Sequence, residues 1–222
     1  MSAAFDLQRL VVGVLGGTGP QGTGLARRFA ASGLAVVIGS RDAARAAEVA
    51  GRLGGGVRGE DNAACARSCD LAIIAVPWAG HADLLRSVAD ELAGKVVVDC
   101  VNPLGFDERG PFPLAVAEGS AAQQAQTLLP RSRVVAAFHH VSAAHLNDAA
   151  ADVDSDVLVL GDDREATDLV QALAGVVPGL RGVYAGRLRN AGQVESLTAN
   201  LLAINRRHRI SAGLRVTGLP SD

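Results

Sequence analysis

The sequence predicts an α/β protein built on a doubly wound parallel sheet. Short runs of apolar residues alternate along the chain with segments of helical periodicity. Most of the apolar runs are continuous, which is typical of strands that are covered on both faces. Because strands and helices alternate in the sequence, parallel strands joined by right-handed crossovers are favoured over hairpins.

Two parts of unequal size are expected. The predicted strands are residues 10–16, 35–39, 71–76, 96–101, 134–138 and 156–160, and the predicted helices lie near 22–32, 43–53, 78–92, 114–129, 164–177 and 190–207. The regular alternation changes after residue 138, where a loop rich in histidine and alanine follows the fifth strand. We therefore expect a larger domain of residues 1–137 and a smaller α+β cap domain of residues 138–222.

Composition excludes several classes of protein. A formal net charge of −2 does not suit a molecule built to bind nucleic acid or an anionic membrane. No apolar run is long enough to span a bilayer, and the N-terminus lacks the pattern of a signal peptide. The three cysteines are an odd number without a leader, so we expect reduced thiols and a cytoplasmic protein. Cys65 and Cys69 are one helical turn apart but have no second ligand pair, so we expect buried cysteines and no metal.

A glycine-rich turn follows the first strand directly. It reads Gly17-Thr18-Gly19-Pro20-Gln21-Gly22, and a helix is expected to begin within it. Gly17 is expected to permit the tight turn, Gly19 to let a pyrophosphate approach the backbone, and Gly22 to let helix and strand pack closely. The amides and dipole of the helix would hold the phosphates. The pattern alone also occurs in ordinary turns, but a strand before it and a second strand at the right distance favour a dinucleotide site.

The second strand ends in residues that favour NADP(H) over NAD(H). An NAD site places an acidic residue near this strand end, whereas Ser40 and Arg41 stand here, with Arg45 one helical turn further on. Arginines at this position can bind a 2′-phosphate. Asp42 opposes this interpretation unless it caps the helix and turns its carboxylate toward the amides. The alternative is a solvated helix start with two surface arginines.

Three further strand ends are expected at the same edge of the sheet. Trp78 follows the third strand, where it would line the ribose or nicotinamide or else be an aromatic side chain buried at a helix start. Residues 101–103 follow the fourth strand and are expected to line the same crevice. His139 follows the fifth strand, where a neutral imidazole can donate a hydrogen bond to a ring carbonyl or nitrogen. His139, His140 and His145 lack acidic or cysteine partners at metal-ligand spacing.

The last long helix carries a polar row beside an apolar one. The apolar row is Val194, Leu197, Leu201 and Ile204, and the polar row is Glu195, Thr198 and Asn205. Buried polar groups need partners, because each unpaired group costs about 1–3 kcal/mol. A ligand would supply such partners; nearby backbone or a second copy of the chain is the alternative.

Together the motifs resemble the NADPH-dependent reductases of coenzyme F-420, a deazaflavin. The motifs are Gly16-Gly17-Thr18-Gly19-x-x-Gly22, Gly39-Ser40-Arg41, Val76-Pro77-Trp78, Phe138-His139-His140-Val141-Ser142-Ala143-Ala144 and Val194-Glu195-Ser196-Leu197-Thr198. They extend over nearly the whole chain. The resemblance implies a Rossmann-type domain with a small cap, a homodimer, and direct hydride transfer between NADP(H) and the deazaflavin.

The resemblance also implies a set of binding residues. Contacts to NADP are implied for Thr18, Gly19, Pro20, Gln21, Ser40, Arg41, Arg45, Trp78, Val101 and Ala143. Contacts to the deazaflavin are implied for His139, Val141, Glu195, Ser196 and Thr198. Among these, His139 is the candidate for orienting the acceptor ring.

The sequence departs from the family pattern on the deazaflavin side. Relatives often carry proline in place of Ser142 and a basic residue in place of Gly192, while Arg187 and Arg189 replace smaller or apolar residues. A more distant similarity to NADP-dependent metal reductases that use flavin, and to pyrroline carboxylate reductases, leaves a flavin, imine or ketone acceptor as the alternative. A non-catalytic redox sensor that binds NADP is a second alternative.

Overall fold

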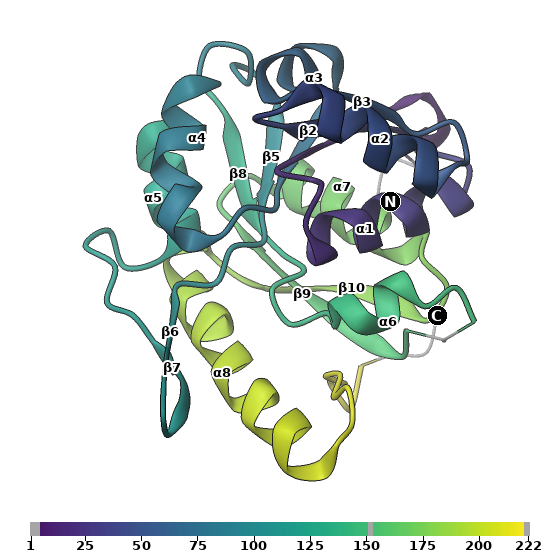
Figure 1. The fold of residues 1–222 in the computed structure, drawn as a ribbon. Helices are drawn as coiled ribbons and strands as arrows, with labels where there is room; N and C mark the ends of the chain where they lie inside the picture. The colour runs from purple at the N-terminus through teal and green to yellow at the C-terminus, as the bar shows by residue number, and fades with distance from the viewer. Residues whose placement is uncertain (1–4, 151–152, 220–222) are drawn as a thin grey trace.

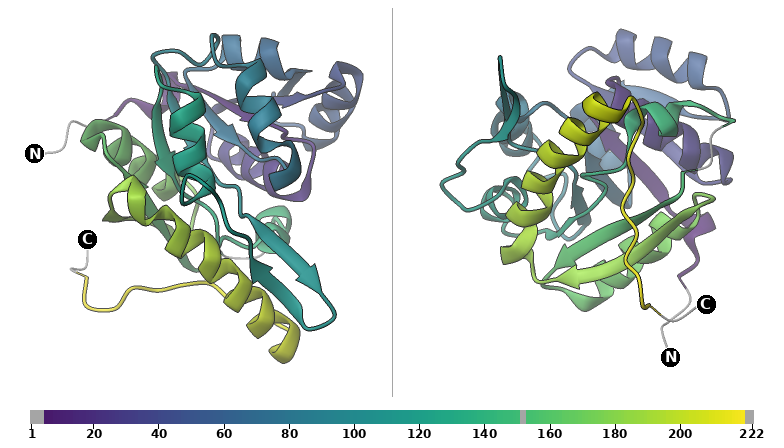
Figure 2. Two further views of the ribbon diagram at one scale, coloured as in Figure 1. Left: turned by 90° about the vertical axis from the view of Figure 1, so that its left-hand side faces the viewer. Right: turned by 90° about the horizontal axis from the view of Figure 1, so that it is seen from below.

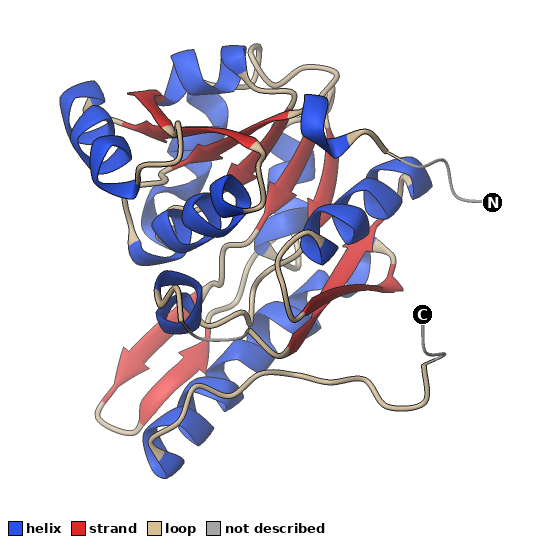
Figure 3. Cartoon of the chain, turned by 90° about the vertical axis from the view of Figure 1, so that its right-hand side faces the viewer, coloured by secondary structure: helices blue, strands red, loops and turns tan. Residues whose placement is uncertain are grey.

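The computed structural model describes residues 5–150 and 153–219. Its centre is an eight-stranded sheet with the order β10-β9-β8-β5-β4-β1-β2-β3, and helices cover both faces (Figures 1 and 3). All neighbouring strands are parallel except β8 and β9. The predicted α/β, doubly wound fold is therefore confirmed.

The strands are β1 Val11–Leu15, β2 Ala35–Ser40, β3 Arg58–Asp61, β4 Leu71–Ile74, β5 Val96–Asp99, β6 Leu104–Asp107, β7 Gly110–Pro113, β8 Arg133–Ala136, β9 Ser155–Gly161 and β10 Leu180–Gly186. The helices are α1 Pro20–Ala31, α2 Ala43–Leu53, α3 Asn62–Ser68, α4 His81–Ser87, α5 Ala121–Leu128, α6 Ala143–Asn147, α7 Arg164–Gly175 and α8 Ala191–His208. Three short 3-10 turns, η1 Leu7–Arg9, η2 Trp78–Gly80 and η3 Leu188–Asn190, complete the described elements.

Two apolar cores lie on opposite faces of the sheet, because successive strand residues point to opposite sides. On one face, alternate residues of β1, β2, β4 and β5 pack against α1, α2, α6 and α7. On the other face, the intervening residues pack against α3, α4, α5 and the start of α8. This double covering explains why the strands read as continuous apolar runs in the sequence.

The strand β9 reverses direction and carries the fold beyond the carboxyl ends of the parallel strands. Only its last two residues pair with β8, in the register Val135↔Gly161 and Ala136↔Leu160. Because the pairing is antiparallel, the earlier part of β9 extends past the end of β8, and β10 lies beside it. The same sheet contains strands from both sides of the boundary expected between residues 137 and 138. The division into two domains therefore stays a prediction.

Several elements were not predicted from the sequence. The edge strand β3 and the helix α3 lack an apolar run, and residues 104–113 form a hairpin of β6 and β7 where a loop and the start of a helix were expected. The expected helix 114–129 is confined to α5, where the Ser120 side chain caps the helix by accepting from the Gln123 amide. The expected helix 78–92 is η2 followed by a short α4.

The cysteines are buried and free, as predicted. Cys65 and Cys69 lie against Gly13 of β1, where a Cβ atom would come within 2.7 Å of the Cys69 Cβ. Within residues 5–150 and 153–219, no helix is long and apolar enough to cross a bilayer.

The hairpin and α8 project together from the body of the protein (Figure 2). Large apolar side chains are exposed on both: Phe106 and Phe112 on the hairpin, and Leu202 and Ile204 on α8. Beyond α8, the chain returns to the start of β9, where the Asp156 amide donates to the Leu214 carbonyl.

Candidate functional site

The turn after β1 is held by contacts to two neighbouring segments. Gly16 has a positive φ of 71°, so the left-handed residue of the turn is Gly16 rather than Gly17, where the tight turn was expected. The Gly17 amide donates to the Gly39 carbonyl at 2.9 Å, and the Gly16 amide donates to Asn62 Oδ1 at 3.1 Å. Asn62 was not singled out in the sequence, and it fixes the turn from the start of α3.

The glycines of the fingerprint have separate roles. A Cβ atom on Gly22 would lie 2.6 Å from the Gly17 Cα, so glycine at both positions allows α1 to approach the turn. A Cβ atom on Gly19 would meet nothing within 4 Å. Gly19 therefore borders open space at the N-terminus of α1, as expected for a backbone that a pyrophosphate approaches.

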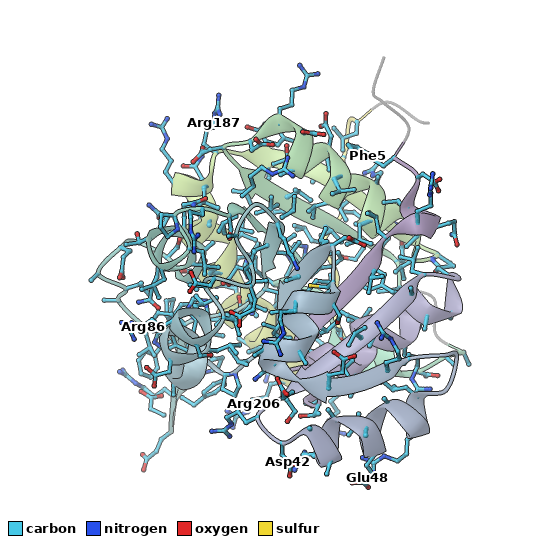
Figure 4. The ribbon with its side chains drawn as sticks, turned by 90° about the horizontal axis from the view of Figure 1, so that it is seen from above. Phe5, Asp42, Glu48, Arg86, Arg187 and Arg206 are labelled. Carbon is cyan, nitrogen blue, oxygen red and sulfur yellow. The ribbon has the colours of Figure 1, made fainter. Side chains whose placement is uncertain are left out.

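The start of α2 presents two unpaired cations. Asp42 caps the helix, since its carboxylate accepts from the Ala44 and Arg45 amides, and its own amide donates to the Ser40 hydroxyl. This capping removes the objection that Asp42 raised to a phosphate site. Arg41 and Arg45 are exposed and form no ion pair with any described residue, and Figure 4 shows that Asp42, between them in the sequence, lies at the periphery of the molecule.

A pocket of about 280 Å³ lies at the carboxyl ends of the parallel strands. It is lined by Gly19, Pro20 and Gln21 after β1, by Ala75, Val76 and Pro77 after β4, by Cys100, Val101 and Asn102 after β5, and by His139 after β8. Four connections thus converge, and one pocket brings together residues of the glycine-rich turn, Val101, Asn102 and His139; Pro103, expected at the same crevice, does not line it. Trp78 follows Pro77 directly and is half-buried.

His139 is the polar side chain most deeply enclosed in this pocket. The residue is 4% exposed, and neither ring nitrogen has a hydrogen-bond partner among the described residues. Burial lowers the pKa of His139 to about 4, so the ring is neutral at physiological pH. A neutral imidazole offers one donor and one acceptor, and both are unused here. The residue before it, Phe138, has a positive φ of 63°, and such strain is concentrated at functional sites.

Hydrogen bonds tie the backbone around His139 to three other elements. Its carbonyl accepts from Asn102 Nδ2 at 2.8 Å and from the Thr198 hydroxyl at 3.2 Å, and the Phe138 carbonyl accepts from Gln21 Nε2 at 3.2 Å. These bonds connect β5, α8 and α1 to the loop that carries His139.

The polar row of α8 has partners within the chain. The Glu195 carboxylate accepts from the Ala121 and Ala122 amides at the start of α5 and is almost fully buried. Burial raises the pKa of Glu195 to about 7, although the two amide hydrogen bonds oppose the shift. Asn205 accepts from the Ala212 amide. Glu195 and Asn205 therefore pair with backbone amides, which was the alternative to pairing with a ligand. Contacts of Glu195, Ser196 or Thr198 with a deazaflavin stay predictions.

Val141 and Ala143, which were also predicted to contact ligands, do not line this pocket. Val141 is buried and Ala143 half-buried, at the start of α6, where Ser142 caps the helix. His140 donates its Nε2 proton to the Asp156 carbonyl. Among the described residues, no group of histidine, cysteine and acidic side chains is arranged to hold a metal.

Comparison with known proteins places the chain in a family. The family model described as NADP oxidoreductase coenzyme F-420-dependent matches residues 11–103. The F-420-dependent NADP reductase of Methanothermobacter thermautotrophicus is 38% identical over 95% of this chain and 96% of its own length. The chain belongs to the F-420-dependent NADP reductases. The protein of that name from Methanocaldococcus jannaschii is 33% identical over 94% of this chain and 98% of its own.

A solved structure of this family supports the same assignment. The crystal structure of a putative F-420-dependent NADP reductase from Arthrobacter sp. FB24 is 25% identical to this chain and superposes with a TM-score of 0.81, over 91% of this chain and 96% of that one. The similarity to this reductase therefore extends well beyond the nucleotide-binding half of the chain.

The open space at Gly19 predicts that a Gly19→Ala variant binds nucleotide poorly while folding normally. Gly19 has φ −83° and ψ 170°, which alanine adopts without strain. We expect an unchanged thermal midpoint and a Kd for NADPH at least about tenfold higher, or ~1.4 kcal/mol. Gly22→Ala is the control, because its Cβ would collide with Gly17 and destabilise the fold by about 1–3 kcal/mol. Unchanged NADPH binding by Gly19→Ala would show that the pyrophosphate lies elsewhere.

The free cations at α2 predict the nucleotide preference. Charge-assisted bonds to a phosphate contribute about 1.5–3 kcal/mol each, so replacing Arg41 and Arg45 together with alanine should weaken NADPH binding at least tenfold. NADH binding should change little. Arg52→Ala is the matched control, because Arg52 lies on the same helix and pairs with Glu48. Equal use of NADH and NADPH by the wild-type protein contradicts the assignment.

Proposed function

We propose that this chain transfers a hydride directly between NADP(H) and the deazaflavin coenzyme F-420. One observation carries the proposal: a single pocket joins the glycine-rich turn of a dinucleotide site to His139, whose ring nitrogens are buried and unpartnered. The relatives named F-420-dependent NADP reductase match nearly the full length of the chain, which supports the same acceptor.

The residues present fit NADP(H). The N-terminus of α1 and the open space beside Gly19 suit a pyrophosphate, and Arg41 and Arg45 suit a 2′-phosphate. We propose that the cofactor contacts are made by Thr18, Gly19, Pro20, Gln21, Ser40, Arg41, Arg45, Trp78, Val101 and Ala143.

The residues present also fit a planar acceptor with ring nitrogens and carbonyls. Each unpartnered nitrogen of His139 costs about 1–3 kcal/mol, which a ligand that supplies a donor or acceptor recovers. We propose that His139 orients this acceptor, with Val141, Ser196 and Thr198 around it. Glu195 supports the site by fixing the start of α5, and any contact with the ligand is additional to its two amide bonds.

The protein itself offers no group to store electrons among the described residues. Burial raises the pKa of the Cys100 thiol well above its usual range, and the thiol donates to the Ile74 carbonyl. Burial also raises the pKa of the Cys65 thiol and of the Cys69 thiol. When bound, NADPH supplies the hydride and the deazaflavin accepts it, so the residues act by binding, orientation and exclusion of water. Both ligands must then be present together.

We also propose a homodimer, with residues 1–137 and 138–222 acting as nucleotide domain and cap. The exposed apolar side chains of the hairpin and α8 offer a surface for a second copy, because large exposed apolar groups mark association sites. The three free cysteines fit a reducing compartment, and we propose the cytoplasm.

Direct transfer predicts that label moves intact from one cofactor to the other. NADPH carrying deuterium at one face of nicotinamide carbon 4 should deliver it to the deazaflavin, and initial-rate plots should intersect. The assay is run alongside flavin, imine and ketone acceptors under the same conditions. Parallel-line kinetics, or loss of label to water before transfer, would exclude a ternary complex, and turnover with another acceptor alone would reject the deazaflavin.

A neutral His139 predicts a specific defect in acceptor binding. His139→Ala should raise the KM for the deazaflavin more than the KM for NADPH, because the lost bonds are to the acceptor. Since the pKa of His139 is lowered to about 4, the ratio of the deazaflavin KM of His139→Ala to that of the wild type should show no titration with a midpoint near 6.5. His208→Asn, at an exposed histidine on α8, is the control. A variant whose defect is confined to NADPH would assign His139 to the nucleotide.

A further inference from the structure

A buried ion pair lies beside the pocket and is absent from the predicted site residues. His81 begins α4 and Asp99 ends β5, and neither side chain has any exposed surface. His81 Nε2 lies 2.6 Å from Asp99 Oδ2, and His81 Nδ1 lies 3.0 Å from Gln124 Oε1. The pair thus connects a helix on one face of the sheet to the strand end that carries the pocket residues Cys100–Asn102.

The hydrogen-bond pattern determines where the protons are. Gln124 Nε2 donates to the Glu118 carboxylate, so the oxygen of the Gln124 amide faces His81 and Nδ1 must carry a proton. Nε2 faces a carboxylate oxygen, which also requires a proton between the two atoms. This pattern excludes a neutral histidine beside an ionised acid, and the raised pKa of His81 favours the imidazolium form of the pair.

The pair contacts two walls of the cofactor site. The His81 ring lies 5.4 Å from the Trp78 ring, centroid to centroid, at an interplanar angle of 32°. The second oxygen of Asp99 accepts from the Val101 amide at 3.0 Å. Trp78 follows the β4 wall of the pocket and Val101 belongs to the β5 wall, so one ion pair supports both.

We propose that His81 and Asp99 form an imidazolium–carboxylate positioning pair that holds Trp78 and the Val101 backbone in the arrangement that accepts the nicotinamide end of NADP(H). This rests on the proposed function only for the identity of the nucleotide. A cation near an aromatic face attracts its π-system, which fixes the tilt of Trp78. Asp99 fixes Val101 through the amide bond. Replacing a buried ion pair by apolar residues is often neutral or stabilising, so stability alone does not explain the pair.

The surrounding charges favour the protonated histidine. Burial by itself lowers the pKa of His81, but the hydrogen bond and charge of Asp99, with the Gln124 bond and the Glu195 charge, raise it above its usual value. Glu195 faces the cluster from α8, and Glu118 reaches it through Gln124. Cys100 and His139 also face Asp99, and both stay uncharged because burial raises the thiol pKa and lowers the imidazole pKa.

Trp78 supplies a direct readout because it is the only tryptophan in the sequence. A protonated imidazole next to indole quenches its fluorescence, so the emission of the ligand-free protein reports the charge of His81. We expect wild-type emission to stay quenched through pH 7 and to rise at a higher pH, above the usual histidine value of 6.5. Asp99→Asn keeps an acceptor for Val101 and should move the rise to lower pH by about one unit or more.

Matched variants separate this explanation from the alternatives. His81→Gln should abolish the pH-dependent rise and increase emission at pH 7, whereas His208→Asn should leave the profile unchanged. Glu195→Gln keeps an acceptor for the α5 amides and should leave a rise in place. Three results would each overturn the proposal. The rise of Trp78 emission with pH could disappear in Glu195→Gln, persist in His81→Gln, or keep its wild-type midpoint in Asp99→Asn. Should the variants not fold, imidazole NMR of the wild-type protein replaces them, and a neutral His81 at pH 7 overturns it equally.

Nucleotide binding tests the positioning role without any turnover. NADPH fluorescence titrations in the absence of deazaflavin should give a Kd about tenfold higher for His81→Gln than for the wild type. The thermal midpoint of that variant is measured in parallel. A folded His81→Gln protein with wild-type affinity for NADPH overturns the positioning role. If the protein fails to reduce the deazaflavin, the proposed acceptor is rejected. The pH profile of Trp78 emission and the Kd for NADPH would still test the positioning pair.

Discussion

The site depends on the short loop after β5, where three hydrogen bonds determine how the surrounding elements meet. Asp99 holds the Val101 amide, Asn102 holds the His139 carbonyl, and the Thr198 hydroxyl reaches the same carbonyl from α8. None of these bonds is made within regular secondary structure. Each fixes a loop that would otherwise have several conformations of similar energy, and fixing a residue's backbone costs about 1–2 kcal/mol. The nucleotide half and the part after β8 are therefore joined at the pocket itself.

The same convergence explains what the sequence predicted well. The glycine-rich turn and the end of β2 are local motifs, so their roles could be inferred from neighbouring residues. Val101 and His139 were expected at the same crevice because each follows or ends an apolar strand, and the carboxyl ends of parallel strands lie at one edge of the sheet. Asp42 was ambiguous in the sequence, and it became interpretable once its carboxylate was found on the amides of α2.

Long-range pairing could not be predicted. His81 and Asp99 are 18 residues apart and on different elements, and an acidic residue at the end of a buried strand was the only signal of their contact. Glu195 accepts from the Ala122 amide, which is 73 residues away in the sequence. The sequence of α8 alone does not show whether the partner of Glu195 is a ligand or the N-terminus of another helix. The reversal of β9 was missed for a similar reason, because a strand's direction is set by its neighbours and not by its own residues. The hairpin of β6 and β7 has no continuous apolar run, and its pairing leaves Phe106 exposed.

The contact at Gly192 joins the start of α8 to the segment that leads into α5. A Cβ atom there would lie 2.7 Å from the Gly119 carbonyl oxygen, in the segment that leads into α5. A side chain can enter this position only after that segment has moved, and Glu195 and the Ser120 cap anchor the helix that follows it. A side chain at position 192 thus requires the Gly119 backbone to shift, so the geometry of the two segments is coupled.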